Sequence, residues 1–269
     1  MFLGAVVQLN SSSDAEGSIA LAHELIRQAA KRGASLIVTP ENTNFLGPHD
    51  QKVRVAETLE GPMICGFAKL AAELQVHLVL GSFNERAPTA GKCYNTSVVF
   101  TPDGTIAATY RKIHLFDVDC GPDVRFKESD TVEAGESPTV VSTPMGIVGL
   151  SICYDLRFPE LYRRYARAGA DILTVPSAFT LTTGKDHWAP LLRARAIENQ
   201  CYVMAAGQCG THDDEGLRES YGHSMIVDPW GHVLAMCSDG PGIAIAEIQS
   251  ERIASVRRGM PTMQHRRLD

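Results

Sequence analysis

Short apolar runs recur along the whole chain, separated by amphipathic segments or by turns. Runs that alternate with a period of two, or that are apolar throughout and end at turn residues, predict β-strands. These are residues 3–8, 35–38, 76–82, 97–100, 105–109, 140–142, 147–152, 172–175, 202–206, 224–227, 233–235 and 243–246. Apolar residues spaced by three and four predict helices over residues 14–31, 63–74, 159–168, 187–200 and 251–257. Ser13 and Glu16 have the spacing of a capping box before the first helix.

The order of these elements predicts an α/β fold. Strands and helices alternate in the first and middle parts of the chain, which favours parallel pairing there. Two turn sequences, TPDG at 101–104 and DPWG at 228–231, each separate two strands and predict hairpins. Many strands and fewer helices favour mixed sheets whose outer faces are covered by helices.

The length of 269 residues is compatible with one large domain or two small ones. No linker rich in proline, glycine or serine and no sustained run of charge divides the chain. Hydrophobic residues make up 44% of the sequence, enough for a large buried core. We therefore expect a single domain over residues 1–269.

The charge and the apolar pattern limit the partners of the protein. A formal net charge of −6 argues against nonspecific binding to nucleic acid or to anionic membranes. All apolar runs are short, and the opening MFLGAVVQLN has the pattern of a β-strand and not of a signal peptide. We therefore expect no nucleic-acid partner and no membrane partner.

Cysteine and histidine usage indicates a reducing compartment and no metal. The seven cysteines include no C-x-x-C pair, which favours reduced thiols and a cytoplasmic location. The nine histidines are dispersed and show no ligand spacing such as H-E-x-x-H. No metal and no other cofactor is expected.

Residues 146–160, GIVGLSICYDLRFPE, run from an apolar strand into Cys153 and then into a helix that opens at Phe158-Pro159-Glu160. A cysteine at such a strand-to-helix turn can be exposed at the edge of a sheet, where the helix N-terminus favours its thiolate. This is the geometry of a thiol nucleophile. On composition alone, a buried structural cysteine is the more common alternative.

Two more reactive groups follow predicted strands. Glu41 comes after the buried run SLIVTP at 35–40, and Lys112, in YRKIHLF, comes just after the strand at 105–109. In open α/β sheets, sites are built at strand ends. Taken singly, each of these residues would more often be a solvated surface charge. With Cys153 they form a set of carboxylate, ammonium and thiol.

The type, order and context of these three residues resemble the nitrilase superfamily of carbon–nitrogen hydrolases. The resemblance covers essentially the whole chain, from VVQLN near the start to HRR near the end. It implies a four-layer α-β-β-α sandwich, a catalytic triad of Glu41, Lys112 and Cys153, and a second glutamate, Glu128, in the segment FKES. It also implies at least a homodimer.

The second half of the chain is similar to the Nit branch of that superfamily. This likeness is carried by PSAF at 176–179, HW at 187–188, LLRARAIENQCYV at 191–203 and SYGHSMIVDPWG at 220–231. Within the branch these motifs most resemble the deaminated glutathione amidases, which implies a small carboxylate-bearing amide as substrate. An ω-amidase acting on α-ketoglutaramate or α-ketosuccinamate is the closest alternative, and a carbamoyl-β-alanine hydrolase is more remote.

The resemblance implies a role for each residue. Glu41 would take the thiol proton and later return a proton to the leaving nitrogen. Lys112 would favour the thiolate and, with the backbone N–H of Tyr154, hold the oxyanion of the tetrahedral intermediate. The acyl-enzyme would be a thioester on Cys153, and Glu128 would orient Lys112 or the substrate.

Deaminated glutathione carries two carboxylates, which need cationic or donor groups in the site. The candidates in the sequence are Arg125, Lys127, Lys185 and His187. The segment 177–188 follows the strand at 172–175, whose end should lie near Cys153. We expect this segment to be a loop that walls the acyl pocket, with Gly184 as a hinge.

Three other functions were considered for this chain. The segment 149–153 nearly forms the G-x-S-x-G elbow of a serine hydrolase, with Ser151 as nucleophile. A papain-like protease would need its local signature around the cysteine, which is absent. A binding protein with an inactive site is the alternative from another class.

Several neighbouring residues are expected to have structural roles. Arg195 and Glu198 can pair across one turn of a helix. Asp155 and Arg157 flank the nucleophile and are expected to brace its turn, and His114 is expected to be a packed histidine.

Overall fold

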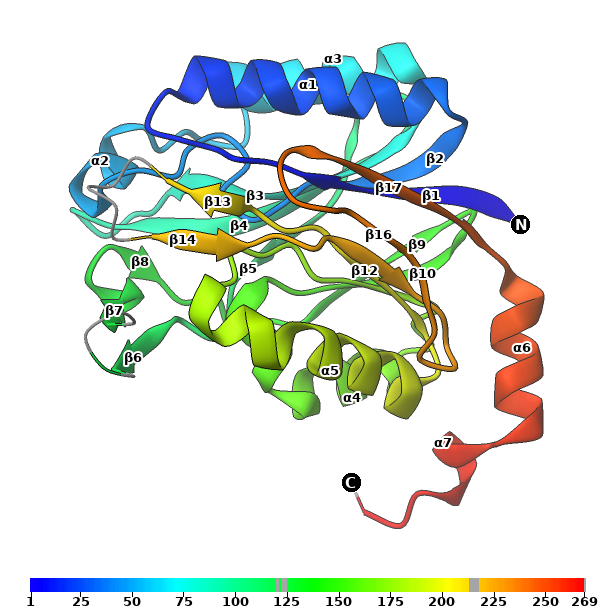
Figure 1. Cartoon of the computed structure of the whole chain (residues 1–269). Helices are drawn as coiled ribbons and strands as arrows, with labels where there is room; N and C mark the ends of the chain where they lie inside the picture. The colour runs from blue at the N-terminus through cyan, green and yellow to red at the C-terminus, as the bar shows by residue number, and fades with distance from the viewer. Residues whose placement is uncertain (120, 122–124, 213–217, 269) are drawn as a thin grey trace.

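Two β-sheets lie face to face, and helices cover the outer face of each sheet (Figure 1). The computed structural model describes residues 1–119, 121, 125–212 and 218–268. The layers follow the order helix, sheet, sheet, helix. This is the predicted four-layer α-β-β-α sandwich, so the predicted fold class is confirmed.

The first sheet mixes parallel and antiparallel pairs in the order β17-β1-β2-β3-β4-β5, and β8 pairs with β4. Strands β1, β2 and β3 are parallel, whereas β17, β4 and β5 join by antiparallel pairing. Its strands are β1 (Phe2–Gln8), β2 (Ala34–Val38), β3 (His77–Arg86), β4 (Cys93–Phe100), β5 (Ile106–Arg111), β8 (Val132–Glu133) and β17 (Gly242–Ile248).

The second sheet has the order β16-β15-β12-β11-β10-β9, with β10, β11 and β12 parallel at its centre. Its strands are β9 (Thr139–Thr143), β10 (Gly146–Leu150), β11 (Ile172–Thr174), β12 (Tyr202–Ala205), β15 (Met225–Val227) and β16 (Val233–Met236). Two short ribbons lie outside both sheets, β6 (Asp117–Asp119) with β7 (Arg125–Lys127), and β13 (Cys209–Thr211) with β14 (Glu219–Tyr221).

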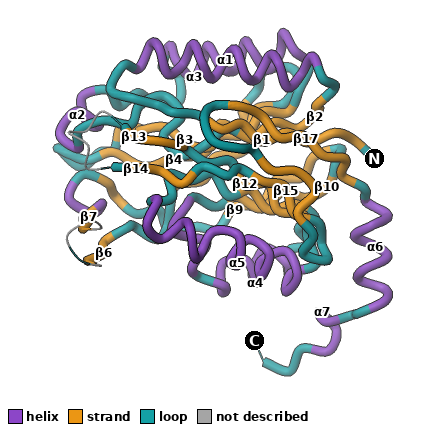
Figure 2. The backbone as a smooth tube through the Cα atoms, viewed as in Figure 1, coloured by secondary structure: helices purple, strands orange, loops and turns teal. Residues whose placement is uncertain are grey.

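Helices α1 (Ala15–Lys31) and α3 (Pro62–Leu74) cover the first sheet, and α4 (Pro159–Arg167) and α5 (Leu181–Asn199) cover the second (Figure 2). The short α2 (His49–Arg54) lies at the end of the sandwich where the ribbons lie. Helices α6 (Ser250–Gly259) and α7 (Thr262–His265) lead the chain away from the layers. Two 3₁₀ turns, η1 (Glu128–Asp130) and η2 (Cys153–Arg157), complete the elements.

One hydrophobic cluster fills the space between the two sheets. Val6 and Val38 of the first sheet and Val148, Ile172 and Val203 of the second belong to it, and all five are fully buried. Because side chains alternate across a strand, the other face of the first sheet packs against α1 and α3 in a second cluster. Strands β1, β2 and β3 of the first sheet are therefore buried on both faces, which explains why they are nearly continuous apolar runs.

Every predicted strand and helix is present, with shifts at the ends. The first helix is capped by Asp14 and not by Ser13, because the Asp14 carboxylate accepts a hydrogen bond from the Gly17 N–H at 3.0 Å. Helices α2 and α7, the 3₁₀ turns, β8 and the two ribbons were not predicted, because segments this short carry too little periodicity. Within the described residues, no helix is long and apolar enough to cross a bilayer.

The prediction of a loop over residues 177–188 is wrong for most of that segment, because α5 begins at Leu181. Thr180 caps this helix through its side chain, which accepts from the Thr183 N–H. Gly184 is therefore not a hinge. It lies within the helix against β14, and a Cβ at this position would lie 2.3 Å from Tyr221 Cβ.

Gly184→Ala is expected to destabilise the protein. Alanine favours a helix over glycine by about 0.5–1 kcal/mol, but forcing a methyl group into this contact costs about 1–3 kcal/mol or more. The matched control is Gly66→Ala in α3, where the nearest atom to the new Cβ is at 4.0 Å. Denaturant unfolding should show a loss for Gly184→Ala and a small gain for Gly66→Ala. Equal effects would contradict the packing role of Gly184.

Candidate active site

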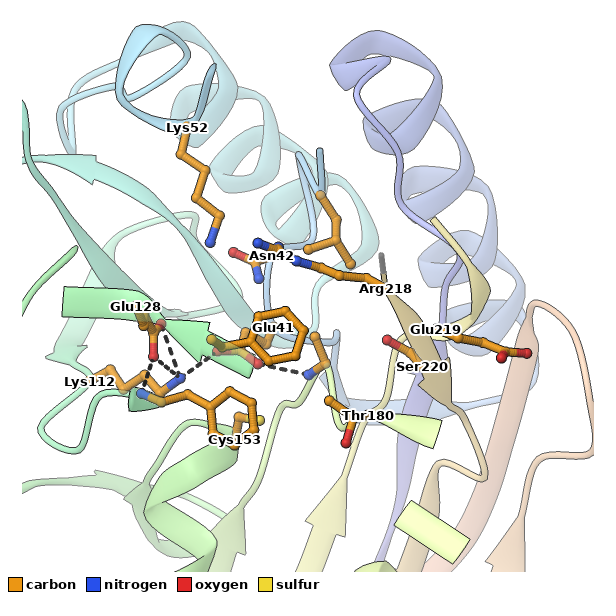
Figure 3. A pocket seen from close by; sticks show the side chains of 14 residues that line it. Glu41, Asn42, Lys52, Lys112, Glu128, Cys153, Thr180, Arg218, Glu219 and Ser220 are labelled. Carbon is orange, nitrogen blue, oxygen red and sulfur yellow. Dashed lines mark hydrogen bonds and ion pairs between the residues drawn. The ribbon is translucent and has the colours of Figure 1, made fainter. Parts of the chain in front are cut away.

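The three candidate catalytic residues come from the ends of strands in both sheets. Glu41 follows β2 and Lys112 follows β5 in the first sheet, whereas Cys153 follows β10 in the second. Their side chains meet with Glu128 at one end of the sandwich (Figure 3). Only the packing of one sheet on the other brings the thiol to the carboxylate and the ammonium.

The turn at Cys153 is sharp and strained. Ile152 is extended, but Cys153 has a φ of +48°, in the left-handed region that side chains with a Cβ disfavour. The Cys153 N–H donates to the Pro176 carbonyl at 2.8 Å. The Asp155 carboxylate accepts from the Ile152 N–H at 2.8 Å and from the Tyr110 hydroxyl at 2.7 Å. These bonds hold the expected nucleophile elbow in place.

Asp155, His114 and Arg195 have the structural roles that we expected. Arg157, which was expected to brace the turn, instead contacts His187 Nδ1 at 3.3 Å and lies over the Phe179 ring. The Asp155 carboxylate also accepts from the His114 backbone N–H at 3.1 Å, and it contacts His114 Nδ1 at 2.7 Å. The His114 ring stacks on Phe158 with 3.7 Å between ring centroids. Arg195 donates to the Leu156 carbonyl at 2.8 and 3.1 Å and pairs with Glu198 at 2.8 Å, which anchors η2 to α5.

Glu41 is buried, and donors surround both of its carboxylate oxygens. Oε1 accepts from Lys112 Nζ at 2.9 Å and from Asn95 Nδ2 at 2.8 Å. Oε2 accepts from the Ala178 backbone N–H at 2.7 Å. Ala178 follows β11, so this last bond links the first sheet to the second.

Lys112 lies between two carboxylates. Its Nζ donates to Glu128 Oε2 at 2.9 Å and Oε1 at 3.1 Å, as well as to Glu41, and the side chain is 2% exposed. Burial opposes the charge, but Glu128 and Glu41 outweigh it and raise the pKa of Lys112 well above its ordinary value. Burial likewise opposes ionisation of Glu128, yet Lys112 and Lys52 lower its pKa to about 2. Lys112 is therefore a permanent cation.

The thiol of Cys153 is neutral in the resting site. Burial, followed by the charge of Glu41, raises its pKa well above the ordinary value, and Lys112 opposes this only in part. Lys112 does favour the thiolate, as expected, but burial and Glu41 outweigh it and keep the thiol protonated. Because the thiol is hydrogen-bonded to Glu41, its proton has an acceptor at the moment of attack.

The backbone N–H of Tyr154 lies in the first turn of η2, directly after the nucleophile. No acceptor among the described residues is found for it. A free N–H beside the sulfur can donate to an oxyanion, as expected for this position. The Tyr154 ring packs edge-on against Phe116 and Phe158, with centroids 5.0 and 5.3 Å away.

A cavity of about 530 Å³, including its part open to solvent, lies over these groups. Besides the four site residues, its walls are formed by Asn42, Leu46, Lys52, Phe116, Phe126, Ala178, Thr180, Arg218, Glu219 and Ser220. A smaller hollow on another side of Cys153 is lined by Tyr154, Arg157, Phe179 and Thr183. The sulfur can thus be reached by a small molecule.

Sequence analysis missed two cations of this wall, Lys52 and Arg218. Lys52 belongs to the short α2, and Arg218 precedes the short β14, so neither follows a predicted strand. The only signal was the proximity of Arg218 to the motif that starts at Ser220. Asn95, which bonds Glu41, was also missed because it lies within a buried strand.

The four cations that the sequence offered for substrate carboxylates do not line the cavity. Arg125 and Lys127 alternate with Phe126 on β7, so the ring faces the cavity and the cations face solvent, where they pair with Asp119 and Asp130. Lys185 and His187 are exposed on α5, and His187 Nδ1 lies 3.3 Å from Arg157 Nη1.

Ser151 is fully buried and cannot act as a nucleophile. Its Oγ donates to the Thr174 carbonyl at 2.7 Å and contacts the Tyr162 hydroxyl at 2.8 Å. The interpretation as a serine hydrolase is therefore wrong.

Comparison with known proteins identifies the class. The family model described as carbon-nitrogen hydrolase matches residues 4–258. The chain belongs to the carbon–nitrogen hydrolase family, as its resemblance to the nitrilase superfamily predicted.

Its relatives narrow this class. Two proteins named deaminated glutathione amidase are 46% identical: that of Bos taurus over 99% of this chain and 82% of its own length, and that of Synechocystis over 98% of both. Nit3 of Saccharomyces cerevisiae, a member of branch 10 of the nitrilase superfamily, matches with a TM-score of 0.88 and 36% identity over 99% of this chain and 97% of its own. The NitFhit protein of Caenorhabditis elegans matches with a TM-score of 0.93 and 40% identity over 99% of this chain, which spans 65% of that protein.

Alkylation by iodoacetamide tests the protonation state of Cys153. Because its pKa lies well above the ordinary value, the thiolate fraction, and with it the labelling rate, should rise about tenfold per pH unit between pH 7 and 9. Mass spectrometry of the labelled peptides measures this rate, with the exposed Cys65 as internal control for the reagent. A rate that stays constant with pH would instead indicate a stabilised thiolate.

Proposed function

We propose that the protein is an amidase that hydrolyses deaminated glutathione through a thioester on Cys153. The observation that carries this proposal is the bond network in which Lys112 joins Glu41 to Glu128 directly beside a strained, neutral thiol. The names of the curated relatives support the choice of substrate.

In the first half-reaction Glu41 takes the proton of the Cys153 thiol as the sulfur attacks the amide carbon. The carbonyl oxygen becomes an oxyanion, which the Tyr154 N–H and the Lys112 ammonium stabilise. The protonated Glu41 then donates its proton to the amide nitrogen, the carbon–nitrogen bond breaks, and the amine leaves. The acyl group remains on the sulfur as a thioester.

In the second half-reaction water replaces the amine. Glu41, again a carboxylate, takes a proton from water, whose oxygen attacks the thioester carbon. The same donors stabilise the second oxyanion. As it collapses, the carbon–sulfur bond breaks, Glu41 returns the proton to sulfur and the acid is released. Because Glu41 is held by three N–H donors, it is aimed at both proton transfers from one position.

Glu128 acts through Lys112. Both of its carboxylate oxygens accept hydrogen bonds from Lys112 Nζ, and one also accepts from the Phe116 N–H at 2.7 Å. Glu128 therefore fixes the ammonium in position and keeps it charged. Asn95 bridges the two glutamates at 2.8 and 3.3 Å and keeps them apart.

The substrate is a γ-glutamyl-like amide in which a keto group replaces the amino group. Its cleavage would release α-ketoglutarate and a dipeptide. An ω-amidase that removes ammonia from α-ketoglutaramate would transfer the same acyl group, so the two activities differ only in the leaving amine. The ratio of kcat/KM for the two substrates separates them.

We further propose a homodimer or higher homo-oligomer in the cytoplasm. Apolar side chains of α5 and of the β15–β16 hairpin are 42–53% exposed: Ile197, Trp230, Val233, Leu234 and Met236. Arg193 Nε bonds the Gly231 carbonyl and joins these two elements into one surface, which a second copy could cover. A monomeric mass in light scattering would contradict the oligomer.

Cys153→Ala is expected to abolish release of the dipeptide from deaminated glutathione while leaving the circular dichroism spectrum unchanged. No other group of the cavity can form the thioester. The matched controls are Cys201→Ala and Cys237→Ala, which remove buried thiols outside the cavity and should stay active. Turnover by a folded Cys153→Ala protein would refute the mechanism.

Lys112→Met is expected to lower kcat about 100- to 1,000-fold through loss of an oxyanion donor. It should also lower the free energy of unfolding by about 3–5 kcal/mol, because two buried carboxylates lose their cation. The neighbouring Arg111→Met is the control, because its side chain is 45% exposed, pairs with Glu85 and does not line the cavity, so kcat should change little. Equal losses of kcat in the two variants would remove Lys112 from the mechanism.

A further inference from the structure

Lys52 is a buried cation on the wall of the cavity. It lies on α2, its side chain points into the cavity, and the residue is 4% exposed (Figure 3). Among the described residues, no carboxylate oxygen lies within 4.0 Å of its Nζ and no hydrogen bond to it is found. A buried ammonium without an anionic partner is costly, so its presence here needs a reason.

A second cation lines the same part of the cavity. Arg218, just before β14, points inwards from the opposite side, and Asn42 lies between the two cations (Figure 3). Burial and then the charge of Arg218 lower the pKa of Lys52 to about 8. Glu128 and Glu41 attract Lys52, but both carboxylates are bonded to Lys112. The Lys52 ammonium, which no carboxylate of the described residues contacts, thus suits an anion that enters this end of the cavity.

We propose that Lys52 and Arg218 bind the carboxylate of the acyl group, the α-keto acid end of the substrate, while Cys153 attacks the amide at its other end. This rests on the proposed amidase function. The carboxylate would accept hydrogen bonds from Lys52 Nζ and from the Arg218 guanidinium. Leu46, Phe116 and Phe126 also line the cavity and suit the two methylene groups of the acyl chain.

Because Lys52 is buried, the carboxylate that binds it is that of the acyl group and not that of the leaving dipeptide. The acyl group stays on Cys153 through both half-reactions, so its charge must remain neutralised in the enclosed part of the cavity. The dipeptide has to leave towards solvent. A cation that is 4% exposed fits the group that stays.

The pH dependence follows from the same contact. The bound carboxylate stabilises the charged form of Lys52, whereas the free enzyme loses that charge as pH rises through about 8. KM for a carboxylate-bearing amide should therefore rise above this pH. KM for an uncharged amide should not change with this titration.

Three amides test the proposal with purified full-length protein: deaminated glutathione, α-ketoglutaramate, and 4-oxopentanamide, in which a methyl group replaces the acyl carboxylate. Lys52→Met should lower kcat/KM about 10- to 100-fold for the first two, mainly through KM, because a hydrogen bond to a charged group is lost. It should lower kcat/KM less than about threefold for 4-oxopentanamide.

The control is Arg54→Met, which removes an exposed cation from the same helix and should leave all three substrates within about twofold. Lys52→Gln provides a second neutral variant should the methionine fail to fold. Equal losses on all three amides would overturn the carboxylate contact. A loss confined to deaminated glutathione would overturn it too, since the cations would then bind the leaving dipeptide.

These outcomes are separate from a failure of the proposed function. If the wild-type protein hydrolyses none of the three amides, the amidase proposal falls and the inference with it. If the wild-type protein is active and Lys52→Met does not discriminate between the substrates, only the assignment of Lys52 and Arg218 is wrong.

Discussion

The buried ammonium of Lys112 is the interaction on which the site depends. Its Nζ lies 2.9 Å from a carboxylate oxygen of Glu41 and 2.9 Å from one of Glu128. All three side chains are at most 8% exposed, so water screens their charges only weakly. Removing Lys112 would leave two buried carboxylates without their cation. The network therefore fixes three segments that are far apart in sequence, and it holds the Glu41 carboxylate beside the thiol, where the proposed proton transfers require it.

The two sheets contribute different parts of the chemistry, and backbone bonds keep these parts in register. The carboxylate of Glu41, from the first sheet, accepts the Ala178 N–H of the second. Within the second sheet, the Cys153 N–H donates to the Pro176 carbonyl beyond the neighbouring parallel strand. Cys153 keeps its unfavourable left-handed backbone conformation because these contacts, together with the bond from the Ile152 N–H to Asp155, hold the turn in place.

Charge is divided along the cavity. At the catalytic end, the cation of Lys112 is matched by two carboxylates, so the site can stabilise a transient oxyanion without holding a permanent anion. At the other end, Lys52 has no carboxylate partner among the described residues, and Arg218 lies nearby. The net charge of −6 cannot attract an anionic substrate over distance, so its recognition must be local.

The sequence by itself determined the order of the longer strands and helices and placed the three candidate catalytic residues at strand ends. Apolar runs of period two and helices of period 3.6 are local signals, and Glu41, Lys112 and Cys153 each follow such a run. Their order and context resembled a known superfamily, which supplied the four-layer fold that periodicity alone does not contain.

Only the tertiary structure decided what depends on contacts between distant segments. The Cys153 pKa is raised because burial and Glu41 act together, and neither is visible in the local sequence. Lys185 and His187 were expected at the substrate because they follow a site strand, but the early start of α5 turns them to solvent. Lys52 and Arg218 reach the cavity from short elements without periodicity. Local patterns encode which face of an element is buried, whereas the direction in which a loop cation points is set by long-range packing.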